Sequence, residues 1–243
     1  MLFHSLGEFC ILRERLTSKQ ICKLIHPQQS KVVACINPYS FWMSLSDKIF
    51  HQSLANSILI CDGKWLAWAM RIRSKQVFCN TGSDLFEVVC ENAKVLKCNR
   101  MFFIGGTEDS LGDLIQKSAK KYPEIEIVGF FSPPFKEEFD GQIVIDLGEQ
   151  ITTSEADVVW IGLGAPKQEK FAMSLSQYCS PTLIGCVGAV FDFQSGRISR
   201  APWFIRQIGF EWLHRLVSDP GRIWPRIVPS LLVVLAVILG IMR

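Results

Sequence analysis

The feature that most constrains this chain is the alternation of short apolar runs with stretches of helical spacing. Six runs of strand length occupy residues 31–37, 57–61, 100–106, 124–131, 157–164 and 182–188. Helical patterns separate them, including one over 108–121 and one that we expect to begin near Ser83, with its hydroxyl as the cap. Strands that alternate with helices pair in parallel and carry helices on both faces. The pattern predicts an α/β fold with a Rossmann-like parallel sheet.

The chain changes character after Gly196. The remaining residues include seven Arg, no Lys and two acids, a net charge of +5, whereas residues 1–196 carry −2. Arginine without lysine suggests contact with phosphate or with an anionic membrane surface. Nucleic acid is disfavoured as a partner, because no nucleic-acid-binding motif accompanies the charge. We therefore expect an α/β domain over 1–196 and a basic, helical appendage over 197–243.

The end of the appendage has no charged side chain over residues 227–242. A membrane-spanning helix needs about 20 apolar residues, so this run is short for a span. A buried core helix, a helix lying in the membrane interface and a marginal span are all compatible with it. We favour membrane association, because Trp203, Trp212, Trp224 and several arginines flank the run, as is typical of an interface.

The nine cysteines are odd in number, irregularly spaced and without a C-x-x-C pair, which disfavours a disulfide framework or a zinc site. Buried, reduced thiols in a cytosolic protein are the simplest interpretation. The first 20 residues lack the basic start and long apolar core of a signal peptide. The sequence also has no D-x-D motif and no cluster of metal ligands, so we predict no metal and no cofactor.

Asp62 is the first candidate for chemistry. It follows the apolar run 57–61, and ligands of open parallel sheets bind where the strands end. A carboxylate there, with Gly63 allowing a turn, is suited to act as a general base. The alternative is that Asp62 only caps the following helix.

Three further turns follow predicted strands. In GLGAPKQE, Pro166 can begin a helix whose first turn includes Gln168, and free N–H groups there suit a phosphate. Gln168 can hydrogen-bond a sugar or uracil. Gly105 and Gly106 end another strand, and Asp192 follows a third apolar run. Each of these segments could equally be an ordinary turn that joins a strand to a helix. None matches a dinucleotide fingerprint or a P-loop.

The order of these segments is more specific than any one of them. Along the chain stand INPYSF, DG, TGSDL, FFIGG, YPEIEIVG, GLGAPKQE, VGAVFDFQSG, RAPWF and GFEWLHRLVSDPGR. Between about Val32 and Arg226 this order resembles the WecG/TagA/CpsF family, glycosyltransferase family 26. The resemblance implies an inverting, metal-independent hexosyltransferase. It implies transfer of N-acetylmannosamine, its uronic acid or glucose from a UDP-sugar donor to a polyprenyl-diphosphate-linked acceptor, in the synthesis of cell-surface polysaccharides.

The resemblance also assigns roles to residues. The family's proposed base falls on Asp62 and its glutamine on Gln168, while Asn37 keeps the asparagine of the first motif. The family's C-terminal arginines, thought to close over the diphosphate, fall on Arg215 and Arg222, with Arg226 displaced by one position. Two positions depart from the family pattern: Cys35 stands where Thr is usual, and Cys79 where Arg is usual.

We expect the protein at the cytoplasmic face of the bacterial inner membrane, either peripheral or anchored by its C-terminal apolar segment, and homo-oligomer formation stays open. Two other functions remain as alternatives. Cys35 and Cys79 favour a degenerate, non-catalytic partner of a polysaccharide assembly complex, whereas intact Asp62 and Gln168 oppose it. A nucleotide-dependent oxidoreductase would share the alternating pattern, but the dinucleotide fingerprint is missing.

Overall fold

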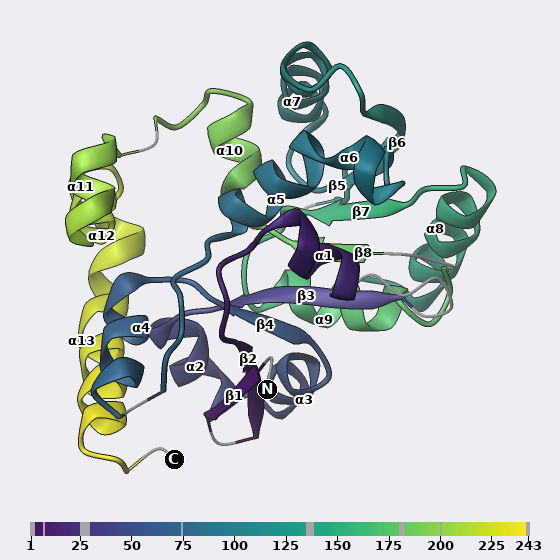
Figure 1. Ribbon diagram of the computed structural model, residues 1–243. Coiled ribbons are helices and arrows are strands. Elements are labelled where there is room, and N and C mark those ends of the chain that lie inside the picture. Colours follow the sequence, from purple (N-terminus) through teal and green to yellow (C-terminus); the bar gives the residue numbers. More distant parts are fainter. Residues whose placement is uncertain are drawn as a thin grey trace.

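A computed structural model describes residues 3–6, 8–24, 30–73, 75–134, 139–179, 183–199 and 201–241. Its centre is an eight-stranded sheet with the strand order β1-β2-β4-β3-β8-β7-β5-β6 (Figure 1). β1 and β2 form an antiparallel hairpin, and all the other pairings are parallel. The strands are β1 Phe3–Leu6, β2 Phe9–Leu12, β3 Lys31–Ile36, β4 Ile58–Cys61, β5 Arg100–Ile104, β6 Glu126–Phe131, β7 Val158–Ile161 and β8 Leu183–Cys186.

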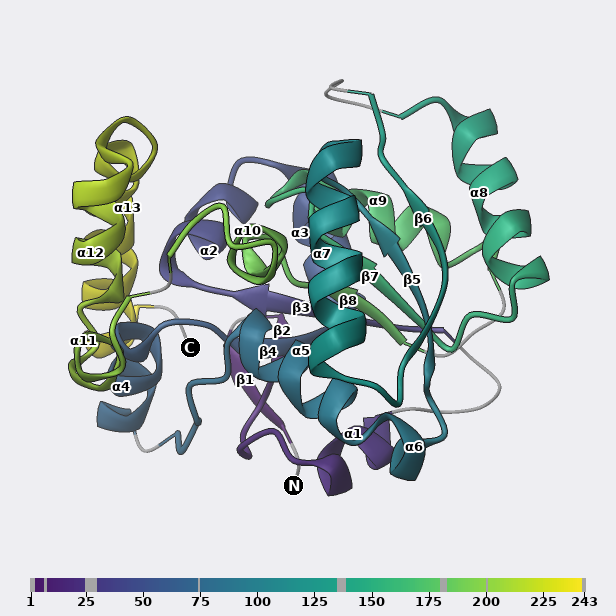
Figure 2. The ribbon, with the colours of Figure 1, turned by 90° about the horizontal axis from the view of Figure 1, so that it is seen from above.

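Helices cover both faces of this sheet, as the sequence predicts (Figure 2). Alternate side chains of a strand point to opposite faces, so Val33 enters one apolar cluster while Ala34 enters the other. One face carries α2 Pro38–Ser44, α3 Lys48–Ala55, α4 Lys64–Ile72, α8 Gly141–Thr153 and α9 Lys167–Leu175. The other carries α1 Ser18–Leu24, α5 Gly82–Glu91, α6 Ala93–Leu96, α7 Glu108–Lys121 and α10 Val190–Gln194.

One helix start differs from the sequence-based prediction. α5 begins at Gly82, and its N-cap is Thr81 rather than Ser83. The Thr81 hydroxyl accepts from the backbone N–H of Asp84, whose carboxylate accepts from the backbone N–H of Thr81 in return. This reciprocal capping box satisfies two donors at once, which a hydroxyl at position 83 cannot do.

The C-terminal helices stand together at one end of the molecule, beside α4 and α2 (Figures 1 and 2). They are α11 Trp203–Ile208, α12 Glu211–Ser218 and α13 Pro220–Ile238. α13 buries Val233, Val234 and Val237 in the apolar cluster of the sheet face that α2 and α4 cover. Within the described part of the chain, no helix is both long and apolar enough to cross a membrane. The domain boundary at residue 196 stays a prediction.

Candidate active site

The candidate residues gather at one edge of the sheet, where five neighbouring parallel strands end. In sheet order these strands are β4, β3, β8, β7 and β5. We call this the carboxyl edge. The chain leaves β4 through Asp62, β3 through Asn37, β7 through Gly162 and β5 through Gly105. Ligands of open parallel sheets bind at this edge, so the topology brings together segments that lie far apart in sequence.

Asp62 lies half-buried directly after β4. Its backbone N–H donates to Ile36 O at 2.8 Å, so the β3–β4 ladder holds it beside the end of β3. The next helix, α4, has Gly63 as its N-cap and no side-chain capping bond. Asp62 therefore lies one residue before the N-cap position of that helix. Gly63 has φ +109°, a conformation that side-chain-bearing residues rarely adopt.

Asn37 has a clear structural task as the N-cap of α2. Its side-chain oxygen accepts from the backbone N–H of Ser40 at 2.9 Å, and the Ser40 hydroxyl accepts from the backbone N–H of Asn37 at 2.8 Å. This capping box uses the Asn37 oxygen. The amide nitrogen has no hydrogen bond to any described residue, so Asn37 can donate to a ligand while it caps the helix.

Gln168 lies in the first turn of α9, as the sequence predicts, and is almost fully buried. Its Oε1 accepts from the backbone N–H of Gly164 at 3.1 Å, and its Nε2 donates to Glu169 Oε1 at 2.8 Å. Glu169 is completely buried, and burial raises the pKa of its carboxyl to about 7, although the bond from Gln168 opposes the shift. The sequence reasoning did not assign Glu169 a role.

The two glycines after β5 have structural explanations. A Cβ on Gly105 would lie 2.6 Å from Gly162 O, because the ends of β5 and β7 approach closely there. A Cβ on Gly106 would lie 2.4 Å from the Ser110 hydroxyl, and Ser110 is the partner of Thr107 in the capping box of α7. The close backbone of Gly162 thus favours glycine at 105, and the positive φ of +71° favours it at 106, while contact of either residue with substrate stays a prediction.

Asp192 lies half-buried in the short helix α10, beyond the end of β8. Its backbone oxygen accepts from Ile198 N at 3.1 Å and from the Ser195 hydroxyl at 3.2 Å. These bonds hold the turn that leads toward the C-terminal helices. A role of its carboxylate in binding a hydroxyl group stays a prediction.

Two partly buried thiols stand near the candidate base. Burial raises the pKa of the Cys79 thiol to about 12 and that of the Cys35 thiol well above its usual range, and the charge of Asp62 raises both further. Both cysteines are therefore neutral at physiological pH. The positions that carry Thr and Arg in the family pattern thus hold uncharged groups here.

The end of α11 and the segment that joins it to α12 are attached to α4, a helix that begins at the site. Lys64 Nζ donates to Gln207 O, and Trp65 Nε1 donates to Gly209 O at 3.2 Å. The Trp65 ring also packs edge-on against Phe210, with ring centroids 6.3 Å apart. These side chains belong to the first turn of α4, directly after Asp62 and Gly63. The sequence reasoning missed this attachment, because nothing in the local pattern indicates a contact across more than 140 residues.

The predicted phosphate-binding arginines lie on these helices. Arg226 on α13 places its guanidinium 5.0 Å from the centroid of the Tyr39 ring, and Tyr39 follows Asn37 by two residues. This contact brings a cation to the start of α2, next to the carboxyl edge. Arg215 and Arg222 lie on α12 and α13, but their side chains are outside the described part of the structure. No group of three His, Cys, Asp or Glu among the described residues has the arrangement of a metal site.

Comparisons with known proteins identify the family of this chain. The glycosyl transferase WecG/TagA/CpsF family matches residues 11–242. An N-acetylglucosaminyldiphosphoundecaprenol N-acetyl-beta-D-mannosaminyltransferase of Bacillus subtilis (strain 168) is 27% identical over 197 residues, which are 80% of this chain and 74% of the relative. The protein of the same name from Bacillus spizizenii is 30% identical over 145 residues, 60% of this chain and 53% of the relative. Because the family match covers nearly the whole chain, this protein is a glycosyltransferase that belongs to the WecG/TagA/CpsF family.

Proposed function

We propose that this glycosyltransferase moves a sugar from a UDP-sugar onto a polyprenyl-diphosphate-linked acceptor, with inversion and without a metal ion. The observation that carries the proposal is the placement of Asp62, Asn37 and Gln168 around one sheet edge, in a chain of this family. The names of both Bacillus relatives describe transfer of N-acetylmannosamine to a diphosphoundecaprenol-linked acceptor, which supports the acceptor class.

In the proposed reaction, the Asp62 carboxylate takes the proton of an acceptor hydroxyl. The hydroxyl oxygen then bonds to the anomeric carbon of the donor, and the bond from that carbon to the UDP phosphate oxygen breaks on the opposite face. The electron pair leaves with UDP, and configuration at the anomeric carbon is inverted. Positioned donors stabilise charge as it develops. We assign that task to Arg215, Arg222 and Arg226, since guanidinium groups bind phosphate oxygens in pairs.

A donor panel tests this proposal. Purified protein is incubated with a GlcNAc-diphosphate polyprenyl acceptor and UDP-N-acetylmannosamine, UDP-N-acetylmannosaminuronic acid or UDP-glucose, and UDP release and glycolipid formation are measured. The relatives' names favour the first donor. If no donor gives UDP or glycolipid, the result would instead support a non-catalytic partner. Hydride transfer to a nicotinamide would support an oxidoreductase.

We further propose that α13 rests on the membrane surface, where a polyprenyl-linked acceptor lies. Its two faces differ: Val233, Val234 and Val237 face the protein, whereas Trp224, Val228, Leu231 and Leu235 are exposed, as is Leu239 directly after the helix. The exposed residues recur at spacings of three and four and thus form one helical stripe. An apolar stripe with flanking tryptophan and arginine is typical of a helix in the membrane interface.

Vesicle flotation tests the membrane contact. With vesicles containing anionic lipid, Leu231→Ser, Leu235→Ser and Leu239→Ser in one chain should reduce the bound fraction strongly, because the variant removes exposed apolar side chains. The matched control is Val95→Ser on α6, which is 74% exposed and far from α13. Equal flotation of the wild type and the triple variant would contradict the proposal.

A further inference from the structure

Glu169 is a buried ionisable group of the described chain that the proposed reaction leaves unexplained. Its side chain is 0% exposed and lies in the first turn of α9, next to Gln168. Oε1 accepts from Gln168 Nε2 at 2.8 Å, whereas Oε2 is buried and has no hydrogen bond to any described residue. No ion pair between described residues includes Glu169. Burying a carboxyl without a full set of partners costs free energy, so its presence needs an explanation other than packing.

The groups that face Glu169 offer it no countercharge. Cys35 from β3 and Cys186 from β8 lie close enough to interact with it electrostatically, and both thiols are neutral. On the same helix, Lys170 is paired with Asp47, the N-cap of α3, at 2.6 Å. Among the described residues, the Glu169 carboxyl therefore interacts with its own backbone N–H and, through one side-chain hydrogen bond, with Gln168.

That contact decides which way the Gln168 amide points. An amide can be turned by 180° so that its oxygen and nitrogen exchange places. Here the oxygen must face the backbone N–H of Gly164, and the nitrogen must face the oxygen of Glu169. The opposite orientation would place two donors against each other on one side and two acceptors on the other. Gly164 and Glu169 thus select one orientation.

The Gln168 amide lies beside the turn that follows β8 at the carboxyl edge. A Cβ on Gly188, just after β8, would lie 3.6 Å from Gln168 Oε1 and 3.8 Å from Nε2. Because Gly188 has no side chain, it does not cover this side of the Gln168 amide. One Nε2 hydrogen is donated to Glu169, and the second has no acceptor among the described residues.

We propose that Glu169 is a positioning residue that holds the Gln168 amide in the one orientation that offers an N–H to the bound sugar nucleotide. This inference rests on the proposed function, since it presumes that Gln168 contacts the donor. A carboxylate and the carbonyl oxygen of a protonated carboxyl can both accept the Gln168 bond. The position therefore requires an acceptor oxygen rather than a negative charge.

A double-mutant cycle on kcat/KM for the UDP-sugar tests the coupling of the two side chains. Glu169→Met removes the acceptor and should lower kcat/KM about tenfold, the usual scale of one lost hydrogen bond. Gln168→Ala should lower it at least as much. The double variant should be no worse than Gln168→Ala alone, because Glu169 acts only through Gln168. Glu169→Gln keeps an acceptor oxygen and should restore kcat/KM to within about threefold of the wild type.

The control is Glu149→Met on the exposed face of α8, which should change nothing. All variants are assayed well below their melting temperatures, so that loss of fold does not imitate loss of positioning. Multiplying losses in the double variant, or wild-type kcat/KM in Glu169→Met, would overturn the proposal.

A second readout separates this proposal from the proposed function, because it needs no turnover. In ¹⁵N-labelled protein, the Gln168 side-chain amide signal is identified by its loss in Gln168→Ala. Its hydrogens should exchange slowly with solvent in the wild type and in Glu169→Gln, and faster in Glu169→Met. Equal exchange in all three would overturn the positioning role. Slow exchange in a protein that releases no UDP would instead retain the positioning contact and reject the proposed reaction.

Discussion

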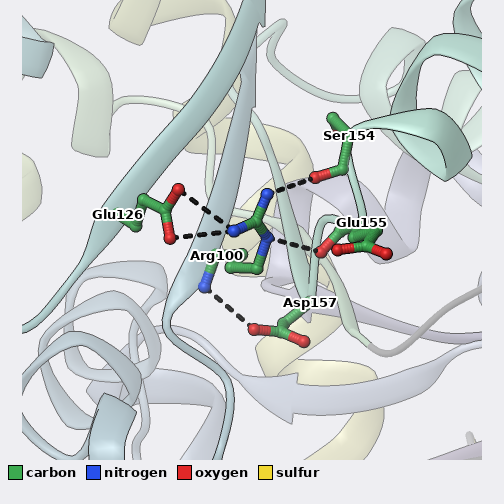
Figure 3. Close-up of polar contacts among 5 residues, drawn as sticks. All are labelled: Arg100, Glu126, Ser154, Glu155 and Asp157. Carbon is green, nitrogen blue, oxygen red and sulfur yellow. Dashed lines mark hydrogen bonds and ion pairs between the residues drawn. The ribbon is translucent and has the colours of Figure 1, made fainter.

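The two edges of the sheet hold their polar groups in opposite ways. At the amino edge, where β5, β6 and β7 begin, the Arg100 guanidinium donates to both Glu126 oxygens at 2.9 and 3.1 Å, to Ser154 O at 3.0 Å and to Glu155 O at 3.2 Å (Figure 3). The Arg100 backbone N–H donates to Asp157 Oδ2 at 2.9 Å. The Arg100 donors thus find their acceptors within this cluster, which joins β5 and β6 to the end of α8.

At the carboxyl edge, not all polar groups find partners within the described chain. The Asn37 nitrogen and one Gln168 hydrogen are left over after their structural bonds, and Glu169 Oε2 has no bond within the described chain. Unsatisfied polar groups cost stability. An edge that stabilises the fold should satisfy its groups, whereas an edge that binds a ligand should leave some open. The comparison therefore predicts that substitutions at the two edges affect different measurements.

Asp62→Asn should give the largest effect, and on catalysis alone. It keeps the size and the polar character of the side chain but removes the proton acceptor, which typically costs about 10²–10⁴ in rate. We expect kcat to fall by that amount, with donor binding by calorimetry and melting temperature unchanged. Asp146→Asn on the exposed side of α8 is the matched control. A kcat within a factor of three of the wild type would remove Asp62 from the mechanism.

Glu169→Gln should change how stability depends on pH. Burial raises the pKa of Glu169 from 4.5 to about 7, so the folded state favours the protonated form. The contribution of this raised pKa to the free energy of unfolding is fully present below pH 4.5. It is lost as pH rises through 7, and the total loss is about 3 kcal/mol. Cys35 and Cys186 do not titrate in this range, since their pKa values are raised.

The variant lacks this titration. Its free energy of unfolding relative to the wild type should therefore rise between pH 4.5 and 8, as measured by urea denaturation at each pH. Glu149→Gln should run parallel to the wild type, because that side chain is exposed. A pH-independent difference between Glu169→Gln and the wild type would contradict burial of an ionisable carboxyl.

Arg100→Met should destabilise the fold without affecting chemistry. It removes the bonds to Glu126, Ser154 and Glu155. The site is partly exposed, so water replaces some of them, and we expect a loss of about 2 kcal/mol. Urea denaturation measures this loss, while kcat per folded molecule should equal that of the wild type. A reduced kcat in fully folded Arg100→Met would show that the two edges are coupled.

The sequence allowed most of this sheet to be predicted, because buried parallel strands are short, nearly continuous apolar runs. The runs at 31–37, 57–61 and 182–188 became β3, β4 and β8, and the helix over 108–121 has the predicted bounds. The hairpin of β1 and β2 was not predicted. Its strands are four residues long, and β2 joins the sheet through Ile11 opposite Leu59, a pairing that no local pattern encodes.

The positions of Asp62, directly after β4, and of Gln168, in the first turn of α9, were predictable from local pattern, whereas their roles stay predictions. Glu169 was missed because it stands between Lys167 and Lys170, and such a charged stretch is typical of a solvent-exposed helix start. A signal was present: Gln168, Phe171, Ala172 and Leu175 follow helical spacing on one buried face, and Glu169 lies three residues before Ala172. The attachment of α4 to the C-terminal helices could not be predicted, because it depends on how separate elements pack.

Removing divalent metal should have the smallest effect. This experiment tests whether side chains near the carboxyl edge, rather than a metal ion, supply the positive charge. We propose that arginines, rather than a metal ion, offset the charge of the departing diphosphate, and Arg226 is held near the edge by its contact with Tyr39. If so, excess EDTA should leave UDP release within experimental error of the untreated enzyme. Arg226→Lys should lower it, because lysine keeps the charge but loses paired phosphate binding. Complete loss of activity in EDTA, restored by Mg²⁺ or Mn²⁺, would assign the offsetting charge to a metal and leave the arginines a secondary role.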